Sequence, residues 1–201
     1  MTHPNLNRRT FLRGALAGGA ALSLGVRSGL AFDVPLDGKP RPGKIGDFKI
    51  SLAEWSLHKK LFEDRSKTTD LNLEFPKMAR EFGIDGVEFV NQFFKDKAQD
   101  DRYLKELKKR ADDQGVTCVL IMIDGEGDLS SADAAERRKA VANHKKWVDA
   151  AKALGCHAIR VNTGSNYSAK DLGAAPDACR KLAEYGAQHH IEVICENHGG
   201  P

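Results

Sequence analysis

Five short apolar segments recur along the chain, and each of them ends in polar residues. They begin near Ile50, Ile84, Val116, Cys156 and Ile191, and they read ISLAEWSL, IDGVEFV, VTCVLIMID, CHAIRVNTG and IEVICEN. Short apolar runs of this kind predict buried β-strands, because a strand inside a parallel sheet is covered on both faces. The polar residues at the ends of these strands are the candidates for function.

Longer stretches with helical periodicity separate the predicted strands. We predict helices over residues 70–82, 100–114, 132–154 and 168–190, the last of which Pro176 is expected to start or to kink. The first three are each followed directly by a glycine, which suits the left-handed residue after a helix. Strands that alternate with helices predict βα units and a parallel sheet.

The sheet can be open or closed into a barrel. An open dinucleotide-binding sheet usually has a glycine-rich turn after its first strand, but here Glu54-Trp55-Ser56-Leu57-His58 follows instead. Polar residues at the end of every strand are typical of a (β/α)8 TIM barrel. Such a barrel needs eight strands and about 250 residues. We therefore expect residues 48–201 to be an incomplete barrel, about the first five βα units of a longer protein.

The N-terminal residues form a targeting signal by our interpretation. The segment 7–13 reads NRRTFLR, a twin-arginine pattern, and a small apolar run over 14–26 follows it. This run is too short and too rich in Gly and Ala for a stable membrane anchor. We predict a twin-arginine signal peptide over 1–31, a Pro/Gly-rich linker over 32–47, the Tat export machinery as a partner, and a periplasmic or secreted protein.

Composition excludes little beyond this. The formal net charge of +3 is too small to favour nucleic acid as a partner. The four cysteines have neither CxxC nor metal-knuckle spacing, so we interpret them as free and structural, with a disulfide as the less favoured alternative. A homo-oligomer is possible.

The fifth predicted strand carries the main candidate for chemistry. It leads directly into Glu196, Asn197 and His198, followed by two glycines. A carboxylate at the end of a parallel strand can bind a hard divalent cation, act as a general base, or do both. The alternative is a solvated acid at a strand end. His198 is a candidate for substrate binding or for orienting Glu196.

Other strand ends supply weaker candidates for substrate binding, each with a structural alternative. Glu88 is equally explained as an ion-pair partner, and Asn91 as a helix cap. Trp55 can stack on a sugar ring, although core packing is the commoner role. Arg160 can hold a hydroxyl or a phosphate, or it can neutralise neighbouring acids. The remaining candidates at strand ends are Glu54 and Asn162.

These strand-end motifs resemble a known superfamily. SLAEWSL, GVEFVNQFF, IMIDGEG, RVNTGS and above all ICENHGG are similar to the xylose-isomerase-like TIM barrels, over residues 48–201. The group includes sugar-phosphate isomerases and epimerases, inosose dehydratases and endonuclease IV. The resemblance implies that Glu196 is a metal ligand for Mn, Mg, Co or Zn. It places the remaining ligands, an Asp, a His and a Glu on later strands, beyond residue 201.

The resemblance implies an isomerase or epimerase of a sugar or sugar derivative that works through an enediolate, with Glu196 as metal ligand and base. It also implies that a small carbohydrate is the substrate. A metal-dependent lyase or hydrolase on the same scaffold, similar to inosose dehydratase, is an alternative, and a non-catalytic sugar-binding remnant is another. The endonuclease type is disfavoured because acids and amides stand where its histidine ligands occur. We expect the 201-residue fragment alone to be inactive.

Overall fold

The computed structural model describes residues 48–64, 70–164 and 173–196, so the predicted signal peptide and linker lie outside the described residues. The sheet has five parallel strands in the order of the sequence, as predicted. They are β1 (Ser51–Ala53), β2 (Gly86–Val90), β3 (Thr117–Ile123), β4 (Ala158–Asn162) and β5 (Glu192–Glu196). Because sequential strands are neighbours and all run in one direction, their carboxyl ends lie along one edge of the sheet.

The helices between the strands agree with the predicted alternation. They are α2 (His58–Asp64), α3 (Leu71–Glu81), α4 (Asp101–Asp113), α5 (Ala134–Leu154) and α6 (Ala175–Gln188). Three short 3₁₀ turns accompany them: η2 (Glu54–Leu57), η3 (Asn91–Phe93) and η4 (Lys95–Lys97). The first strand is therefore shorter than its apolar run, because the chain turns at Glu54.

Helix boundaries follow from local capping. The side chains of Asp70, Asp100 and Asp133 each accept a main-chain N–H from the first turn of the following helix. At the other end, Gly155 has a φ of 71°, the left-handed conformation expected after a helix. Pro176 lies in the first turn of α6, where its missing N–H costs no helical hydrogen bond. It starts the helix and does not kink it.

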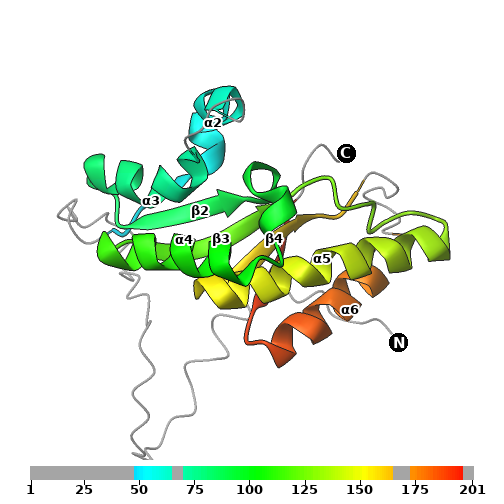
Figure 1. Cartoon of the computed structure of the whole chain (residues 1–201). Helices are drawn as coiled ribbons and strands as arrows, with labels where there is room; N and C mark the ends of the chain where they lie inside the picture. Colours follow the sequence, from blue (N-terminus) through cyan, green and yellow to red (C-terminus); the bar gives the residue numbers. More distant parts are fainter. Residues whose placement is uncertain (1–47, 65–69, 165–172, 197–201) are drawn as a thin grey trace, which may run out of the picture. The chain divides into compact units, whose positions relative to one another are not determined.

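The main core lies between the sheet and one layer of helices. Helices α3, α4, α5 and α6 pack side by side against this face (Figure 1). Alternate strand residues point into this core, among them Phe89, Ile121 and Val161, where they meet the fully buried Trp147 of α5. Burial of large apolar side chains at this layer is the main source of stability for the described part of the chain.

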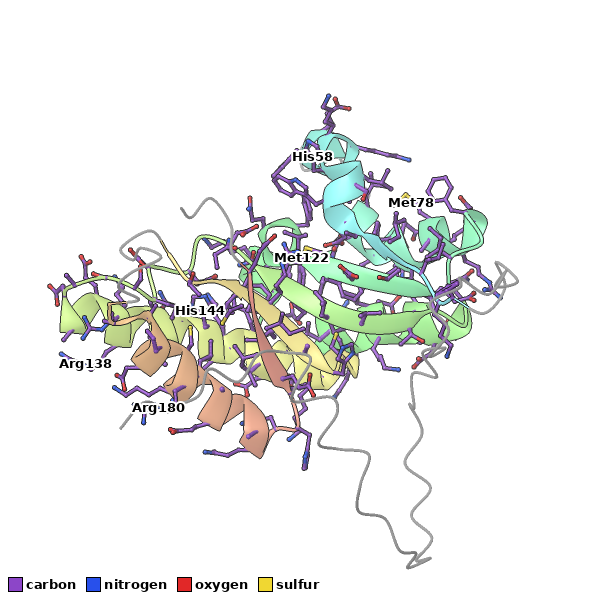
Figure 2. The ribbon with its side chains drawn as sticks, turned by 180° about the vertical axis from the view of Figure 1, so that it is seen from behind. His58, Met78, Met122, Arg138, His144 and Arg180 are labelled. Carbon is purple, nitrogen blue, oxygen red and sulfur yellow. The ribbon has the colours of Figure 1, made fainter. Side chains whose placement is uncertain are left out.

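The opposite face of the sheet, which we call the open face, carries a smaller apolar cluster. It consists of Val90, Leu120, Met122 and Ala158. Met122 lies on the sheet, whereas His144 lies on α5 in the helix layer (Figure 2). In a closed barrel this would be the interior face, and the polar strand ends would surround its opening.

A β-bulge in β3 sets which residues of that strand reach the open face. Val87 of β2 pairs with Cys118, but the next residue, Glu88, pairs with Leu120, so Val119 is an extra residue. Cys118 faces the helices, and both Val119 and Leu120 pack on the open face. From this point the even-numbered residues of β3 face the open side.

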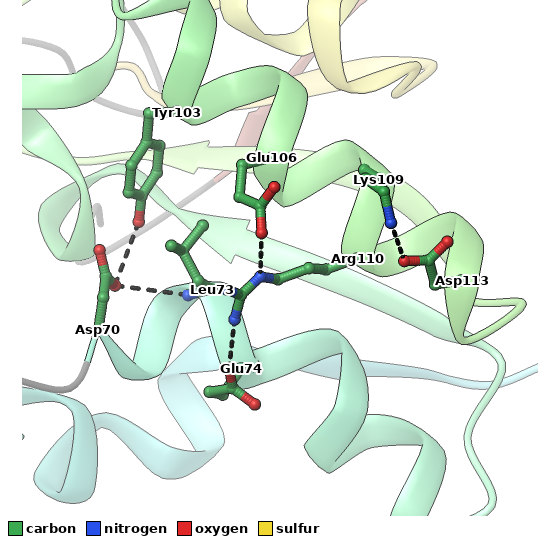
Figure 3. A network of polar contacts seen from close by, with 8 residues as sticks. All are labelled: Asp70, Leu73, Glu74, Tyr103, Glu106, Lys109, Arg110 and Asp113. Carbon is green, nitrogen blue, oxygen red and sulfur yellow. Dashed lines mark hydrogen bonds and ion pairs between the residues drawn. The ribbon is translucent and has the colours of Figure 1, made fainter.

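Polar contacts join the neighbouring helices α3 and α4. Tyr103 of α4 donates its hydroxyl to Asp70, the residue that caps α3 (Figure 3). The same hydroxyl accepts a hydrogen bond from the side chain of Asn72. Arg110 of α4 contacts Glu74 of α3 and also Glu106 on its own helix (Figure 3). These contacts join the two helices both within the core and near the surface. No helix in the described ranges is both long and apolar enough to cross a membrane.

Candidate functional site

Polar side chains that follow or end four neighbouring strands, β2 to β5, lie in a series at the carboxyl ends of the strands. Asp124, just after β3, accepts hydrogen bonds from Gln92 of η3 (3.1 Å) and from Asn162 of β4 (2.6 Å). Asn162 is paired in register with Glu196 of β5, and Arg160 lies 2.9 Å from the Glu196 carboxylate. We call Gln92, Asp124, Asn162, Arg160 and Glu196 the strand-end row.

The strand register explains why these side chains share one face. Met122, Arg160 and Ile194 are direct neighbours across β3, β4 and β5. Since side chains alternate between the two faces of a sheet, Asn162 and Glu196, two residues further along their strands, point to the same side as these neighbours. The predicted convergence of the third, fourth and fifth strand ends on one face is therefore observed, and it includes Glu196.

Arg160 and Glu196 form a half-buried ion pair. Their side chains are 30% and 28% exposed, and the nitrogen–oxygen distance is 2.9 Å. A guanidinium beside a carboxylate at this depth is less screened than a surface pair, and it orients the carboxylate. The sequence left open whether Arg160 binds substrate or neutralises acids, and in this structure it neutralises Glu196.

Asn91 has a structural role in addition to any contact with substrate. It is fully buried, and its side-chain amide donates to the main-chain oxygen of Asp124 and accepts from the main-chain nitrogen of the same residue, both at 2.9 Å. These two bonds fasten the end of β2 to the end of β3. Asn91 therefore fixes the main chain of Asp124, whose carboxylate belongs to the strand-end row.

Glu54 is also buried, unlike the other acidic candidates. One carboxylate oxygen accepts the main-chain N–H of Val90 at 2.5 Å, and the other has no hydrogen-bond partner among the described residues. Burial raises the pKa of Glu54 well above its ordinary value, and the Val90 hydrogen bond only partly opposes this. The buried position of Glu54 thus favours its protonated form. Its hydrogen bond to Val90 connects it to the end of β2.

Glu88 lies deeper on the open face. It accepts a hydrogen bond from the hydroxyl of Ser51 on the neighbouring strand β1. Trp55, by contrast, is 47% exposed, so the expectation that it packs in the core is wrong. Its ring stacks on His58 with centroids 4.9 Å apart and lies near Phe62 and Phe93. An exposed aromatic ring of this kind is available to a sugar face.

A hollow of about 910 Å³ lies beside the row, lined by Gln92, Phe93, Lys95, Asp96, Asp124, Gly125 and Lys146. Asp124 is thus both the hub of the hydrogen bonds and part of the wall of a cavity. A second groove, of about 440 Å³, runs between α5 and α6 in the helix layer and includes none of the strand-end row. The first of the two has the position expected for a substrate site in a parallel barrel.

The sequence did not single out Asp124 among its site residues, although its place after an apolar strand was visible. Glu126, another acid of the same segment, turns to α5, where it accepts from the Trp147 indole at 3.0 Å and pairs with Lys146. Both acids lie beyond the end of β3, and their opposite directions depend on the path of the loop after the strand, which has no clear signal in the sequence. His198 lies outside the described residues.

The donor atoms of the row suit a hard cation, because carboxylate and amide oxygens are its preferred ligands. Among residues 48–64, 70–164 and 173–196, however, no three His, Cys, Asp or Glu side chains converge to hold a metal ion. Glu196 can therefore contribute one ligand, and the described residues do not form a complete site.

Comparison with known proteins identifies two regions of the chain. Residues 76–201 match the family described as Xylose isomerase-like TIM barrel, and residues 5–25 match the TAT (twin-arginine translocation) pathway signal sequence. The second match supports export across the cytoplasmic membrane, as the sequence predicted. A search of curated proteins gave no match.

Several solved structures share the fold. A sugar phosphate isomerase/epimerase from Parabacteroides distasonis is 17% identical over 81% of this chain and 55% of its own, with a TM-score of 0.53. The probable 3-DHS dehydratase AsbF from Bacillus anthracis is 18% identical over 75% of this chain and 53% of its own, with a TM-score of 0.56. The IOLI protein with a binding zinc atom is 12% identical over 74% of this chain and 51% of its own, with a TM-score of 0.56. The chain thus spans about half the length of the solved structures that it matches, and the likeness concerns the fold.

Proposed function

Because the chain belongs to the xylose isomerase-like TIM barrel family, we propose that it is the N-terminal part of an exported, divalent-metal-dependent isomerase or epimerase of a sugar or sugar derivative. The observation that carries this proposal is the position of Glu196: its carboxylate lies at the end of β5, on the same face as the rest of the strand-end row. The proposal places the protein in the periplasm or outside the cell.

The proposed reaction removes a proton from the carbon beside a carbonyl group. An isomerisation places it on the neighbouring carbon, and an epimerisation places it on the opposite face of the same carbon. Glu196 removes the proton; in an isomerisation the same carboxyl returns it to the neighbouring carbon, whereas an epimerisation needs a second acid on the opposite face of the enediolate. A divalent ion (Mn, Mg, Co or Zn), when bound, supplies the Lewis acid that stabilises the negative oxygen of the enediolate. Glu196 would be one of its ligands, and the remaining ligands are proposed to lie beyond residue 201.

Other residues of the open face would bind and orient the sugar. Asn162, held by Asp124, can donate or accept with a hydroxyl, and Arg160 can move from Glu196 to a substrate oxygen. Trp55 can stack on an apolar sugar face at the edge of the site. Glu88 is placed to accept hydroxyl hydrogen bonds deeper in the barrel, while Asn91 and Glu54 hold the end of β2 in position.

The test is an exchange experiment on the product of the whole reading frame that contains this chain. Incubation with ketoses and Mn²⁺ in D₂O should place deuterium on the carbon beside the carbonyl group, as followed by NMR. Glu196→Gln should lower the exchange rate by about 10²-fold or more. Glu192→Gln, at the other end of β5 on the same face, is the matched control and should change the rate little. Equal exchange by Glu196→Gln and the unchanged protein would overturn the proposal.

A dehydratase is the second candidate, because the fold is shared with a probable 3-DHS dehydratase. The same proton removal leads to loss of water when the leaving hydroxyl lies beside the new carbanion. Product analysis by mass separates the two candidates, since isomerisation preserves the mass and dehydration removes one water. Saturable sugar binding without either change would favour a non-catalytic binding protein.

A further inference from the structure

Two of the four cysteines lie in direct contact. Cys179, in the first half of α6, and Cys195, near the end of β5, have their sulfur atoms 3.6 Å apart. A disulfide has a sulfur–sulfur distance of about 2.05 Å, so a small rotation of the two side chains would bring the sulfur atoms to bonding distance. The contact joins the helix layer to the strand that carries Glu196.

The chain topology brings the two residues together. Helix α6 ends at Gln188 and leads through a short turn into β5, so helix and strand run in opposite directions. The early part of α6 therefore lies beside the late part of β5. Cys195 is in register with Val161, which faces the helix-side core, and Cys179 packs against the same core. Both side chains thus lie on the helix side of the sheet, opposite to Glu196.

The four cysteines differ in accessibility. Cys118 and Cys156 are buried, whereas Cys179 is half-buried and Cys195 is exposed. Burial raises the pKa of Cys118 and Cys156. Cys195 is therefore the thiol that an oxidant in solution reaches first, and Cys179 lies in contact with it.

We propose that Cys179 and Cys195 are a redox-active pair that forms a reversible disulfide after export. The Cys195 thiolate attacks a disulfide oxidant, such as an oxidised dithiol protein or glutathione disulfide, and expels one thiolate. The Cys179 thiol then loses its proton and attacks the Cys195 sulfur of the mixed disulfide, expelling the second thiolate. The pair loses two electrons and two protons, and the oxidant is reduced to two thiols.

The export route agrees with this chemistry. The chain carries a twin-arginine signal, a pathway that moves folded proteins out of the reducing cytoplasm. A disulfide that forms after such export has to close on the folded protein, so it requires thiols that are already adjacent and open to an oxidant. Cys179 and Cys195 meet both conditions. The bond would fasten the end of β5 to α6, immediately before Glu196, and the inference does not depend on the catalytic role proposed above.

The test is a thiol count on the purified full chain. Reduced protein is incubated with a glutathione-disulfide buffer, denatured with an alkylating reagent and counted. We expect four free thiols to fall to two, a single bridge between the Cys179 and Cys195 peptides by mass spectrometry, and recovery of four thiols with excess dithiol reductant.

Matched variants locate the bridge. Cys118→Ala should still lose two thiols, while Cys179→Ser and Cys195→Ser should each keep their remaining three, with circular dichroism used to confirm that they are folded. Four free thiols after oxidation, a bridge that includes Cys118 or Cys156, or a disulfide-linked dimer on a non-reducing gel would each overturn the proposal.

Discussion

The Arg160 guanidinium of β4 lies 2.9 Å from the Glu196 carboxylate of β5, on the open face of the sheet. This pair ties the proposed base to the neighbouring strand. It also means that a cation or a substrate at Glu196 has to share that carboxylate with Arg160 or displace the guanidinium. The strength of the pair is therefore a measurable property of the proposed site.

A double-mutant cycle measures this coupling. Arg160→Met and Glu196→Gln are each expected to lower the free energy of unfolding, and the double variant should lose less than the sum. Because both side chains are about two-thirds buried, we expect a coupling energy of about 1 kcal/mol by urea denaturation. The more exposed pair Arg180 and Asp177 on α6 is the control and should show a smaller coupling. Additive losses at Arg160 and Glu196 would show that the two groups do not interact in solution.

Glu54 should make stability depend on pH. Its pKa is higher in the folded protein than in the unfolded chain, mainly because of burial, so the folded protein binds the proton more tightly. The free energy of unfolding should therefore fall as pH rises above the ordinary glutamate pKa of 4.5, until the raised pKa of the folded state is passed.

Glu54→Gln removes this titration while its side-chain oxygen still accepts the Val90 N–H. Its stability relative to the unchanged protein should improve steadily from pH 4.5 to pH 8, as measured by urea denaturation. Glu54→Ala leaves that buried N–H without a partner and should cost about 1–3 kcal/mol. Glu81→Gln, an exposed position on α3, is the control. Parallel pH profiles for the unchanged protein and Glu54→Gln would contradict the raised pKa.

Gly186 is expected to reverse the usual effect of a glycine-to-alanine change in a helix. A Cβ at this position would lie 2.5 Å from the main-chain oxygen of Ile191, a group that cannot move without shifting the start of β5. In an open helix position the change to Ala gains up to about 1 kcal/mol, but here we expect a loss of about 1–3 kcal/mol. Thermal or urea unfolding measures the difference.

The control for Gly186 is the exposed neighbour Ala187, where Ala187→Gly should cost no more than about 1 kcal/mol. Because Ile191 leads into β5, Gly186→Ala should also slow disulfide formation between Cys179 and Cys195. A stabilised Gly186→Ala variant would mean that α6 lies further from β5 than the structure shows.

Asp70 and Asp133 cap α3 and α5, and they should differ in their contribution to stability. Asp133 accepts from one main-chain N–H, whereas Asp70 accepts from two and also from the Tyr103 hydroxyl of α4 (Figure 3). Asp133→Ala should cost about 1 kcal/mol, the usual value for a helix cap. Asp70→Ala should cost about 2 kcal/mol, since a hydrogen bond between two helices is lost as well. Equal losses in urea denaturation would show that the Tyr103 contact contributes nothing.

The periodicity of the sequence was sufficient to predict the architecture. Short apolar runs alternate with longer helical stretches along the chain. This alternation predicted the parallel sheet, the strand order and the four helices α3 to α6. Glu196 was also predictable, because an acid that directly follows a buried strand lies at a strand end whatever the details of packing.

Residues whose role depends on contacts between distant segments were not predictable. Asn91 was expected to cap a helix or bind substrate, but it holds the main chain of Asp124, which lies 33 positions later. Trp55 was expected in the core and is half exposed. Cys195 was interpreted as a structural cysteine, but it is exposed and lies in contact with Cys179. The neighbours of Asn91 and Cys195 come from another βα unit, and a single sequence does not show which distant residues meet.

The extra residue Val119 interrupts the alternation of side chains along β3, because Val119 and Leu120 both pack on the open face. Had β3 alternated regularly from Cys118 onward, its even-numbered residues, Asp124 included, would face the helices, and Gln92 and Asn162 would lose the group that joins them. Deletion of Val119 would remove the bulge and still leave Leu120 opposite Glu88, so Asp124 would keep its side of the sheet. The geometry of the proposed site thus depends on two successive residues that share one face, and neither of them carries a functional group.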